Sequence, residues 1–144
     1  MQENLDKGWK CYDAIMENYE PVRGDVLQAA EAAGMAPGQQ LKLELGLEEM
    51  LVNVISYAYE EVGKVWVRAA VEGELFWLEL ADHGKPFNPL AKDMRHDESL
   101  PLEEREPGGF GIFLVKENFR SVEYRYEMFE GAMANHLVMV LPVK

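Results

Sequence analysis

The stretch EEREPGGFGIFLVKENF, residues 103–119, places three glycines directly before a strongly apolar run. The apolar run predicts a helix over residues 111–119, although glycine disfavours helix formation. A helix N-terminus carries free N–H donors and a partial positive charge, so it attracts anions such as phosphate. Glycine lacks a Cβ and lets a ligand approach the backbone closely. The stretch therefore predicts a helix that begins at an anion-binding backbone, and a loop that happens to end there is the alternative.

Two helices are predicted upstream of this stretch, over residues 20–33 and 41–61. Gly34 fits the end of the first helix, and residues 36–40 form a short connector. In the second helix, apolar side chains recur at helical spacing and form one stripe for burial. The members of this stripe are Leu47, Leu51, Val54, Ile55 and Ala58.

Strands are predicted in adjacent pairs, with Gly73 and Gly131 near the two hairpin turns. The predicted strands are residues 64–71, 74–81, 121–129 and 134–143, with a weaker one near 8–15. Paired strands with helices between the pairs predict the α+β class, as a two-layer sandwich built on an antiparallel or mixed sheet. Residues 91–108 have many charges and no clear period, so we expect a long, functional surface loop there.

The composition narrows the class of protein. A chain of 144 residues suits one domain, residues 1–144, and its net charge of −12 argues against a nucleic-acid or anionic-membrane binder. The single cysteine, Cys11, permits no internal disulfide, as in a reducing intracellular setting. No apolar run reaches the roughly 18–20 residues of a membrane span, and the polar N-terminal segment is unlike a signal peptide. We therefore expect a cytoplasmic protein.

Glu49 and Asn53 lie one turn apart in the long predicted helix, on a polar stripe with Ser56 and Glu60. A solvated helix face is one interpretation. However, asparagine is a poor interior helix residue, and apolar residues surround Asn53. An amide oxygen one turn from a carboxylate can ligate Mg²⁺ while the carboxylate takes a proton or orients a nucleophile.

Asp82 follows directly on an apolar strand, and Gly84 comes two residues later. An Asp-x-Gly turn at a strand end is one interpretation. The functional interpretation is an acceptor-only carboxylate at the mouth of a pocket, where it accepts a hydrogen bond from an amino group such as that of adenine. Gly84 would then let the ring approach the backbone.

The three features follow one another along the chain as Glu-x-x-x-Asn, Asp-x-Gly and Gly-Gly-x-Gly. This order resembles the N, G1 and G2 boxes of the GHKL (Bergerat-fold) ATPases, and especially those of the anti-sigma-factor serine/threonine kinases. Three strings carry the resemblance, EEMLVNVISYAYEE, ADHGKPFNPL and LPLEEREPGGFGIFLVK, and the similarity spans residues 20–142. It implies the GHKL form of the sandwich, with the helices on one face of the sheet.

By this resemblance, Glu49 is the catalytic carboxylate and Asn53 is the Mg²⁺ ligand in a site for ATP. Asp82 would read the adenine amine, with Gly84 beneath the base.

The phosphate side of the site is likewise implied by the resemblance. Gly109 and Gly111 would line the phosphates, and residues 91–108 match the nucleotide lid of the family. Arg105 matches a lid arginine that neutralises charge on the γ-phosphate.

The resemblance implies an ATP-binding anti-sigma factor that phosphorylates a serine or threonine of an anti-anti-sigma antagonist. Its partners would be a sigma factor and that antagonist, without direct contact with nucleic acid or membrane, and it would form a homodimer. The alternative is an ATP-binding regulatory module of the same fold without kinase activity. The intact Glu49 favours the kinase, and departures from the family pattern favour the module. A histidine-kinase catalytic domain is a lower-ranked third interpretation. The departures are Tyr57, Asn88, Arg120, Asn135 and His136.

Overall fold

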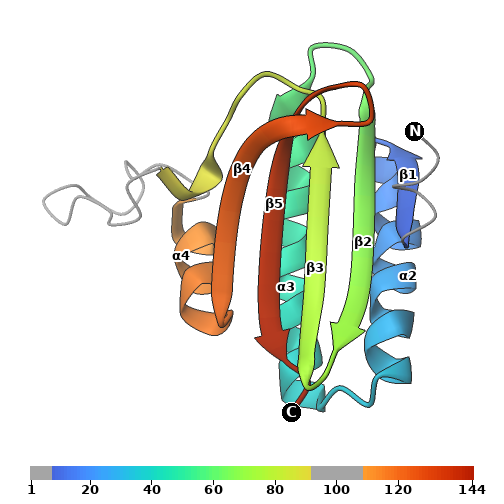
Figure 1. Cartoon of the computed structure of the whole chain (residues 1–144), viewed down its shortest axis with the longest axis vertical. Helices are drawn as coiled ribbons and strands as arrows, with labels where there is room; N and C mark the ends of the chain where they lie inside the picture. The colour runs from blue at the N-terminus through green and yellow to red at the C-terminus, as the bar shows by residue number, and fades with distance from the viewer. Residues whose placement is uncertain (1–7, 92–108) are drawn as a thin grey trace, which may run out of the picture.

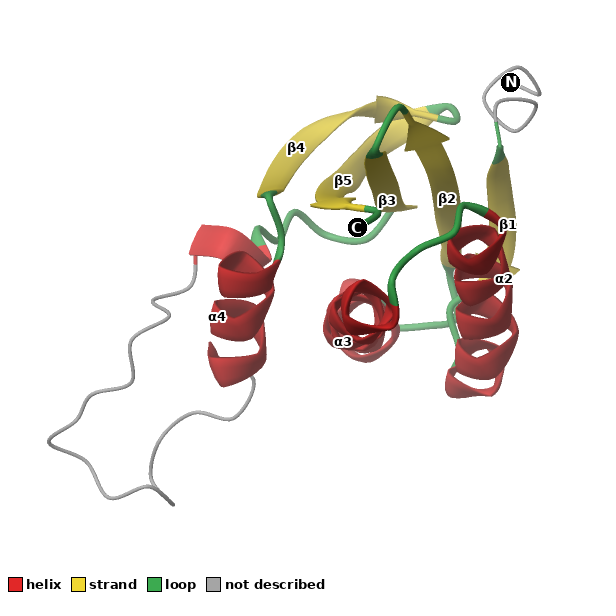
Figure 2. Cartoon of the chain, turned by 90° about the horizontal axis from the view of Figure 1, so that it is seen from below, coloured by secondary structure: helices red, strands yellow, loops and turns green. Residues whose placement is uncertain are grey.

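Five antiparallel strands form one layer of the molecule, and the helices cover one face of that layer (Figure 1; Figure 2). The computed structural model describes residues 8–91 and 109–144. The strands lie in the order β1-β2-β3-β5-β4, and every neighbouring pair is antiparallel. The strands are β1 (Trp9–Asp13), β2 (Lys64–Glu72), β3 (Leu75–Asp82), β4 (Ser121–Phe129) and β5 (Ala132–Pro142). The predicted α+β class is confirmed, with a sheet that is antiparallel throughout its described strands.

The helices of the described residues lie side by side below the sheet in Figure 2, with α2 under β1 and β2, α3 near the centre and α4 on the β4 side. The α-helices are α2 (Tyr19–Ala32), α3 (Pro37–Asn53) and α4 (Gly109–Asn118). Three short segments complete the helical layer: the 3-10 turns η1 (Met16–Asn18) and η3 (Pro89–Ala91), and the π-helix η2 (Val54–Ala58). No helix in the described ranges is long and apolar enough to cross a membrane.

Strand alternation builds the core between the two layers. Phe76, Leu78 and Leu80 occupy alternate positions of β3 and are at most 2% exposed, because this face of the strand lies against the helices. The side chains of α3 that join the same core are Leu43, Leu47, Met50 and Leu51, also at most 2% exposed. Their spacing follows the helical period, as the sequence predicted for Leu47 and Leu51.

The long helix differs from its prediction at both ends. It begins at Pro37, because proline is favoured in the first helical turn, so most of the predicted connector is helical. Its α-helical part ends at Asn53, and the chain continues as the π-helix η2. Glu60 lies beyond that segment, so the predicted polar stripe does not extend to it. π-Helices are rare and occur frequently at functional sites.

The smaller predicted elements are confirmed. The weak strand near the N-terminus is β1, which pairs with β2. Gly73 and Gly131 have φ values of +63° and +85°, so each hairpin turn uses a backbone conformation that glycine adopts readily. Helix α4 begins at Gly109, within the glycine-rich stretch where the sequence predicted a helix start.

Candidate functional site

A pocket opens between the C-terminal end of α3, the π-helix η2 and the end of the sheet formed by β3, β4 and β5. Its apolar lining consists of Met50, Val54, Ala58, Leu80, Pro89 and Leu137. Its aromatic and polar lining consists of Asn53, Tyr57, Asp82, Lys85, Phe87, Tyr124 and Asn135. We call this cavity the main pocket. An apolar cavity with a few convergent polar groups is the usual form of a small-molecule site.

Asp82 is the buried carboxylate of the main pocket, with 5% of its surface exposed. Its Oδ1 accepts hydrogen bonds from the Gly84 backbone N–H and from Asn135 Nδ2, both at 2.9 Å. No hydrogen bond from the described residues reaches its Oδ2. Burial raises the pKa of Asp82 above its usual value, while the two donors oppose that rise. Oδ1 of Asp82 is thus already hydrogen-bonded within the protein, whereas Oδ2 can accept a hydrogen bond from a ligand.

Gly84 has a packing role in this site. A Cβ at this position would lie 2.2 Å from the carbonyl oxygen of Ala58, in η2. The neighbouring Lys85 N–H donates to the same oxygen at 3.3 Å. The turn after β3 therefore lies directly against the π-helix, and only glycine permits that approach. That a base lies against Gly84 stays a prediction.

Asn53 and Glu49 lie one turn apart on α3, as predicted. Asn53 Nδ2 donates to Glu49 Oε2 at 3.4 Å. Asn53 lines the main pocket and also a neighbouring pocket that it shares with Glu49, Ser56 and Tyr57, which we call the side pocket. The structure thus places Asn53 at the junction of two cavities, with Asp82 on one side and Glu49 on the other.

The glycine-rich stretch is described only from Gly109 onward. Gly109 and Gly111 lie in the first turn of α4. Arg105 and the predicted lid, apart from Ala91, lie outside the described residues. Lys116, one turn further along α4, donates to the carbonyl of Leu90 at 3.2 Å and so ties α4 to the η3 segment.

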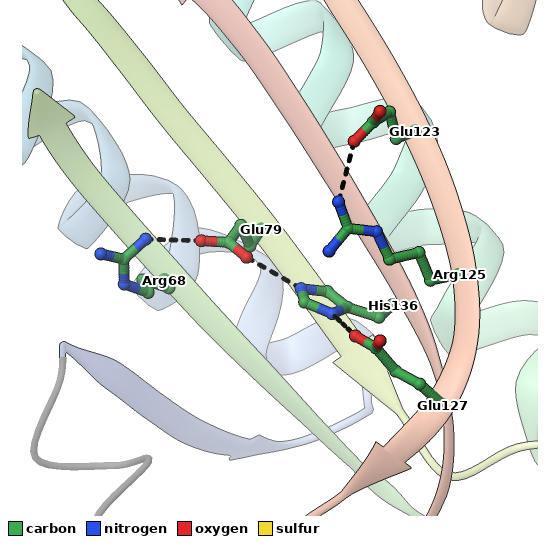
Figure 3. Close-up of polar contacts among 6 residues, drawn as sticks. All are labelled: Arg68, Glu79, Glu123, Arg125, Glu127 and His136. Carbon is green, nitrogen blue, oxygen red and sulfur yellow. Dashed lines mark hydrogen bonds and ion pairs between the residues drawn. The ribbon is translucent and has the colours of Figure 1, made fainter.

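His136 lies on the sheet face opposite the helices, away from the main pocket. Figure 3 shows it between Glu79 and Glu127, with Arg68 on the far side of Glu79. Its Nε2 lies 2.8 Å from Glu79 Oε1 and its Nδ1 lies 2.6 Å from Glu127 Oε2. Burial alone would lower the pKa of His136, but the two carboxylates outweigh it and raise the pKa. His136 is 8% exposed and belongs to a polar network on this face of the sheet.

Asn135 and Tyr124 are among the pocket residues whose part in the site the sequence did not predict. Asn135 stood out only as a departure from a family pattern. One further signal was present, since asparagine is uncommon in strands and this one interrupts an apolar run. Its partner could not be inferred, because the pairing of Asp82 with Asn135 depends on the β3–β5 register.

Comparison with protein families shows that residues 13–141 match the histidine kinase-like ATPase domain. The match covers all the described strands except the first four residues of β1 and the last residue of β5. A comparison with curated proteins gives no match.

Proposed function

The chain belongs to the histidine kinase-like ATPase family, and on that premise we propose that it binds Mg·ATP and regulates transcription by partner switching. It holds a sigma factor, and it phosphorylates a serine or threonine of an anti-anti-sigma antagonist. ATP binding follows from the family itself. The serine/threonine kinase activity and the two protein partners go beyond the family and are what we propose here.

The observation that carries the proposal is the state of the Asp82 carboxylate. It lies in an apolar pocket with Oδ1 held by two donors and Oδ2 free of hydrogen bonds from the described residues. An open carboxylate oxygen of this kind favours a ligand with an amino group, because a ligand without a donor would bury that oxygen and leave it unpaired. The exocyclic amine of adenine is such a donor, whereas guanine carries an acceptor oxygen at the same ring position.

The residues at the junction of the two pockets fit a magnesium ion. An asparagine amide oxygen is a hard ligand, and Mg²⁺ typically takes only one or two protein ligands together with phosphates and water. Among the described residues no three His, Cys, Asp or Glu side chains form a metal cluster. Asn53 would hold the ion, and the ion would neutralise phosphate charge during transfer.

Glu49 acts on the acceptor hydroxyl in this proposal. It lies within hydrogen-bond reach of Asn53 and lines the side pocket, where a hydroxyl from a partner protein can enter. A carboxylate in that position orients the hydroxyl and takes its proton. The backbone at Gly109 and Gly111, with Arg105, would hold the phosphates.

The charge of the chain supports protein partners rather than DNA. Its net charge of −12 complements the basic surfaces with which sigma factors contact promoters. Phosphorylation adds about −1.5 to −2 charges to the antagonist, so it would weaken that complex and release the protein for the sigma factor. A second copy of the chain would complete a homodimer in the cytoplasm.

The alternative is an ATP-binding regulatory module without kinase activity. One observation favours it: Glu49 lines the side pocket and not the main pocket that contains Asp82. A carboxylate displaced from the phosphates would leave binding intact and transfer absent.

Label transfer from γ-labelled Mg·ATP separates these functions. The protein is incubated with an anti-anti-sigma protein from the same organism, and label on a serine or threonine of that protein supports the kinase. ATP binding without label transfer supports the module. Absence of ATP binding contradicts both.

A further inference from the structure

Asn135 is a buried amide, 7% exposed, whose hydrogen-bonding capacity is fully used. Its Nδ2 donates to Asp82 Oδ1 and to the Lys85 carbonyl, both at 2.9 Å, and has a longer hydrogen bond to the Gly84 carbonyl at 3.4 Å. Its Oδ1 accepts from the Phe87 N–H at 3.0 Å and from the Tyr124 hydroxyl at 2.5 Å. A side-chain amide offers two N–H groups and two lone pairs. The Asn135 side chain therefore has no group left over for a ligand.

Sheet register puts Asn135 where it can reach these partners. Asp82, the last residue of β3, pairs with Asn135 across the β3–β5 ladder. Tyr124 comes from β4, the strand on the other side of β5. Lys85 and Phe87 belong to the turn that follows β3. One amide on β5 thus connects the strands on either side of it, β3 and β4, to the turn between β3 and η3.

Asp82, Lys85, Phe87 and Tyr124 share a second property, since each of them lines the main pocket. An amide with a purely structural role would have partners scattered through the core. Here four of the five hydrogen bonds end on residues that line one cavity, and the fifth ends on Gly84, which lies in the chain between the lining residues Asp82 and Lys85.

We propose that Asn135 is a positioning residue for nucleobase recognition in the main pocket. It fixes the Asp82 carboxylate with Oδ1 engaged and Oδ2 free, and it holds the backbone of Lys85 and Phe87 as the adjoining wall. Asn135 acts through these residues and does not itself contact the base. The inference rests on the proposed binding of an adenine nucleotide.

Loss of the Asn135 amide should raise the pKa of Asp82, which a loss of packing alone would not explain. Burial raises the pKa of Asp82, and donation from Asn135 and from the Gly84 N–H opposes the rise, as does the nearby His83. Lys85 is the other charged group of the described pocket lining, Tyr57 and Tyr124 are its phenols, and the phenol of Tyr59 lies close to Asp82. Without Asn135, Asp82 takes up its proton at a higher pH and stops accepting a hydrogen bond. ATP affinity in the variant should then fall as the pH is lowered, from a higher pH than in the wild type.

The test measures ATP and GTP binding by calorimetry with Mg²⁺, across pH, for the full chain and three variants. Asn135→Ala removes the amide, and Tyr124→Phe removes one of its donors while keeping the aromatic wall. Tyr126→Phe is the matched control, because Tyr126 lies on the same strand, is 40% exposed and is outside the pocket lining.

Asn135→Ala should weaken ATP binding about tenfold or more, with a smaller change for GTP, so the ATP/GTP preference falls. Tyr124→Phe should give a smaller change in the same direction, and Tyr126→Phe should give none. Thermal melts establish which variants fold, and Tyr124→Phe carries the test if Asn135→Ala does not.

The outcomes distinguish a failure of the proposed ATP binding from a failure of the proposed role of Asn135. A wild-type protein that binds no ATP overturns the proposed function and this inference together. A wild type that binds ATP, with folded variants that keep its ATP/GTP preference and pH profile, overturns the role of Asn135 alone.

Discussion

Replacing Gly84 with alanine should destabilise the protein in the absence of any nucleotide. The new Cβ would lie 2.2 Å from the Ala58 carbonyl oxygen and 2.7 Å from its carbonyl carbon. Both atoms are backbone, so no side-chain rotation can relieve the clash. The turn after β3 and the π-helix η2 must instead move apart by roughly 1 Å, in an interior that transmits strain.

The size of the effect follows from two contributions. Overpacking of a close-packed interior typically costs about 1–3 kcal/mol. Separation of the two segments also weakens the hydrogen bond from the Lys85 N–H to the Ala58 carbonyl, which is already 3.3 Å long. A net hydrogen bond contributes about 0.5–1.5 kcal/mol. We therefore expect Gly84→Ala to lose about 2–3 kcal/mol of unfolding free energy, near the upper end of the overpacking range.

Gly24→Ala is the matched control. Gly24 is an exposed residue inside α2, and nothing lies within 4 Å of a Cβ built there. Alanine at such a site stabilises a helix by about 0.5–1 kcal/mol. Urea unfolding of the two variants and the wild type, followed by circular dichroism, should shift the midpoint down for Gly84→Ala and up for Gly24→Ala. Equal midpoints for the two variants would refute the close contact between the turn and η2.

Three further predictions concern the remaining polar groups. Glu49→Gln should leave ATP affinity nearly unchanged and slow label transfer by about a hundredfold or more, and an unchanged transfer rate would remove Glu49 from the chemistry. Asn53→Ala should weaken ATP binding with Mg²⁺ more than without it, and equal losses in the two titrations would argue against a metal ligand. His136 has a pKa raised by Glu79 and Glu127, so its contribution to stability is complete below the ordinary histidine pKa of about 6.5 and is lost as the pH rises through the raised value. The stability gap between wild type and His136→Gln should therefore narrow from neutral to alkaline pH in urea titrations, and a gap that widens would contradict the bridged imidazolium.

The strands and the core were predictable because their signals are local. β3 alternates large apolar side chains, and α3 repeats leucines at helical spacing, so each element carries its own pattern. The π-helix has no such signal. Its residues continue the apolar run of α3, and the contact of its last carbonyl with the turn at Gly84 becomes visible only in the folded chain.

The site was predictable only in part, because some of its contacts join residues that are far apart in the sequence. Asp82 and Asn53 could be named, since each stands in a short motif with a chemical rationale. The link from Asp82 to Asn135 spans 53 positions and requires the β3–β5 register. The position of His136 also depends on register, because a shift of one residue would turn its ring from the outer face of the sheet to the face that the helices cover.

Calorimetry of wild type and Asp82→Asn with Mg·ATP and Mg·GTP tests the central claim most directly. Asparagine keeps the shape of the side chain, but it can satisfy the Gly84 and Asn135 donors only with its oxygen, which turns its N–H₂ toward the pocket. The free acceptor then becomes a donor, suited to the guanine oxygen. The account predicts that the wild type prefers ATP and that the ATP/GTP ratio falls by about tenfold or more in the variant. A wild type that binds both nucleotides equally, or a variant that keeps the wild-type preference, would contradict the assignment of Asp82 to the adenine amine.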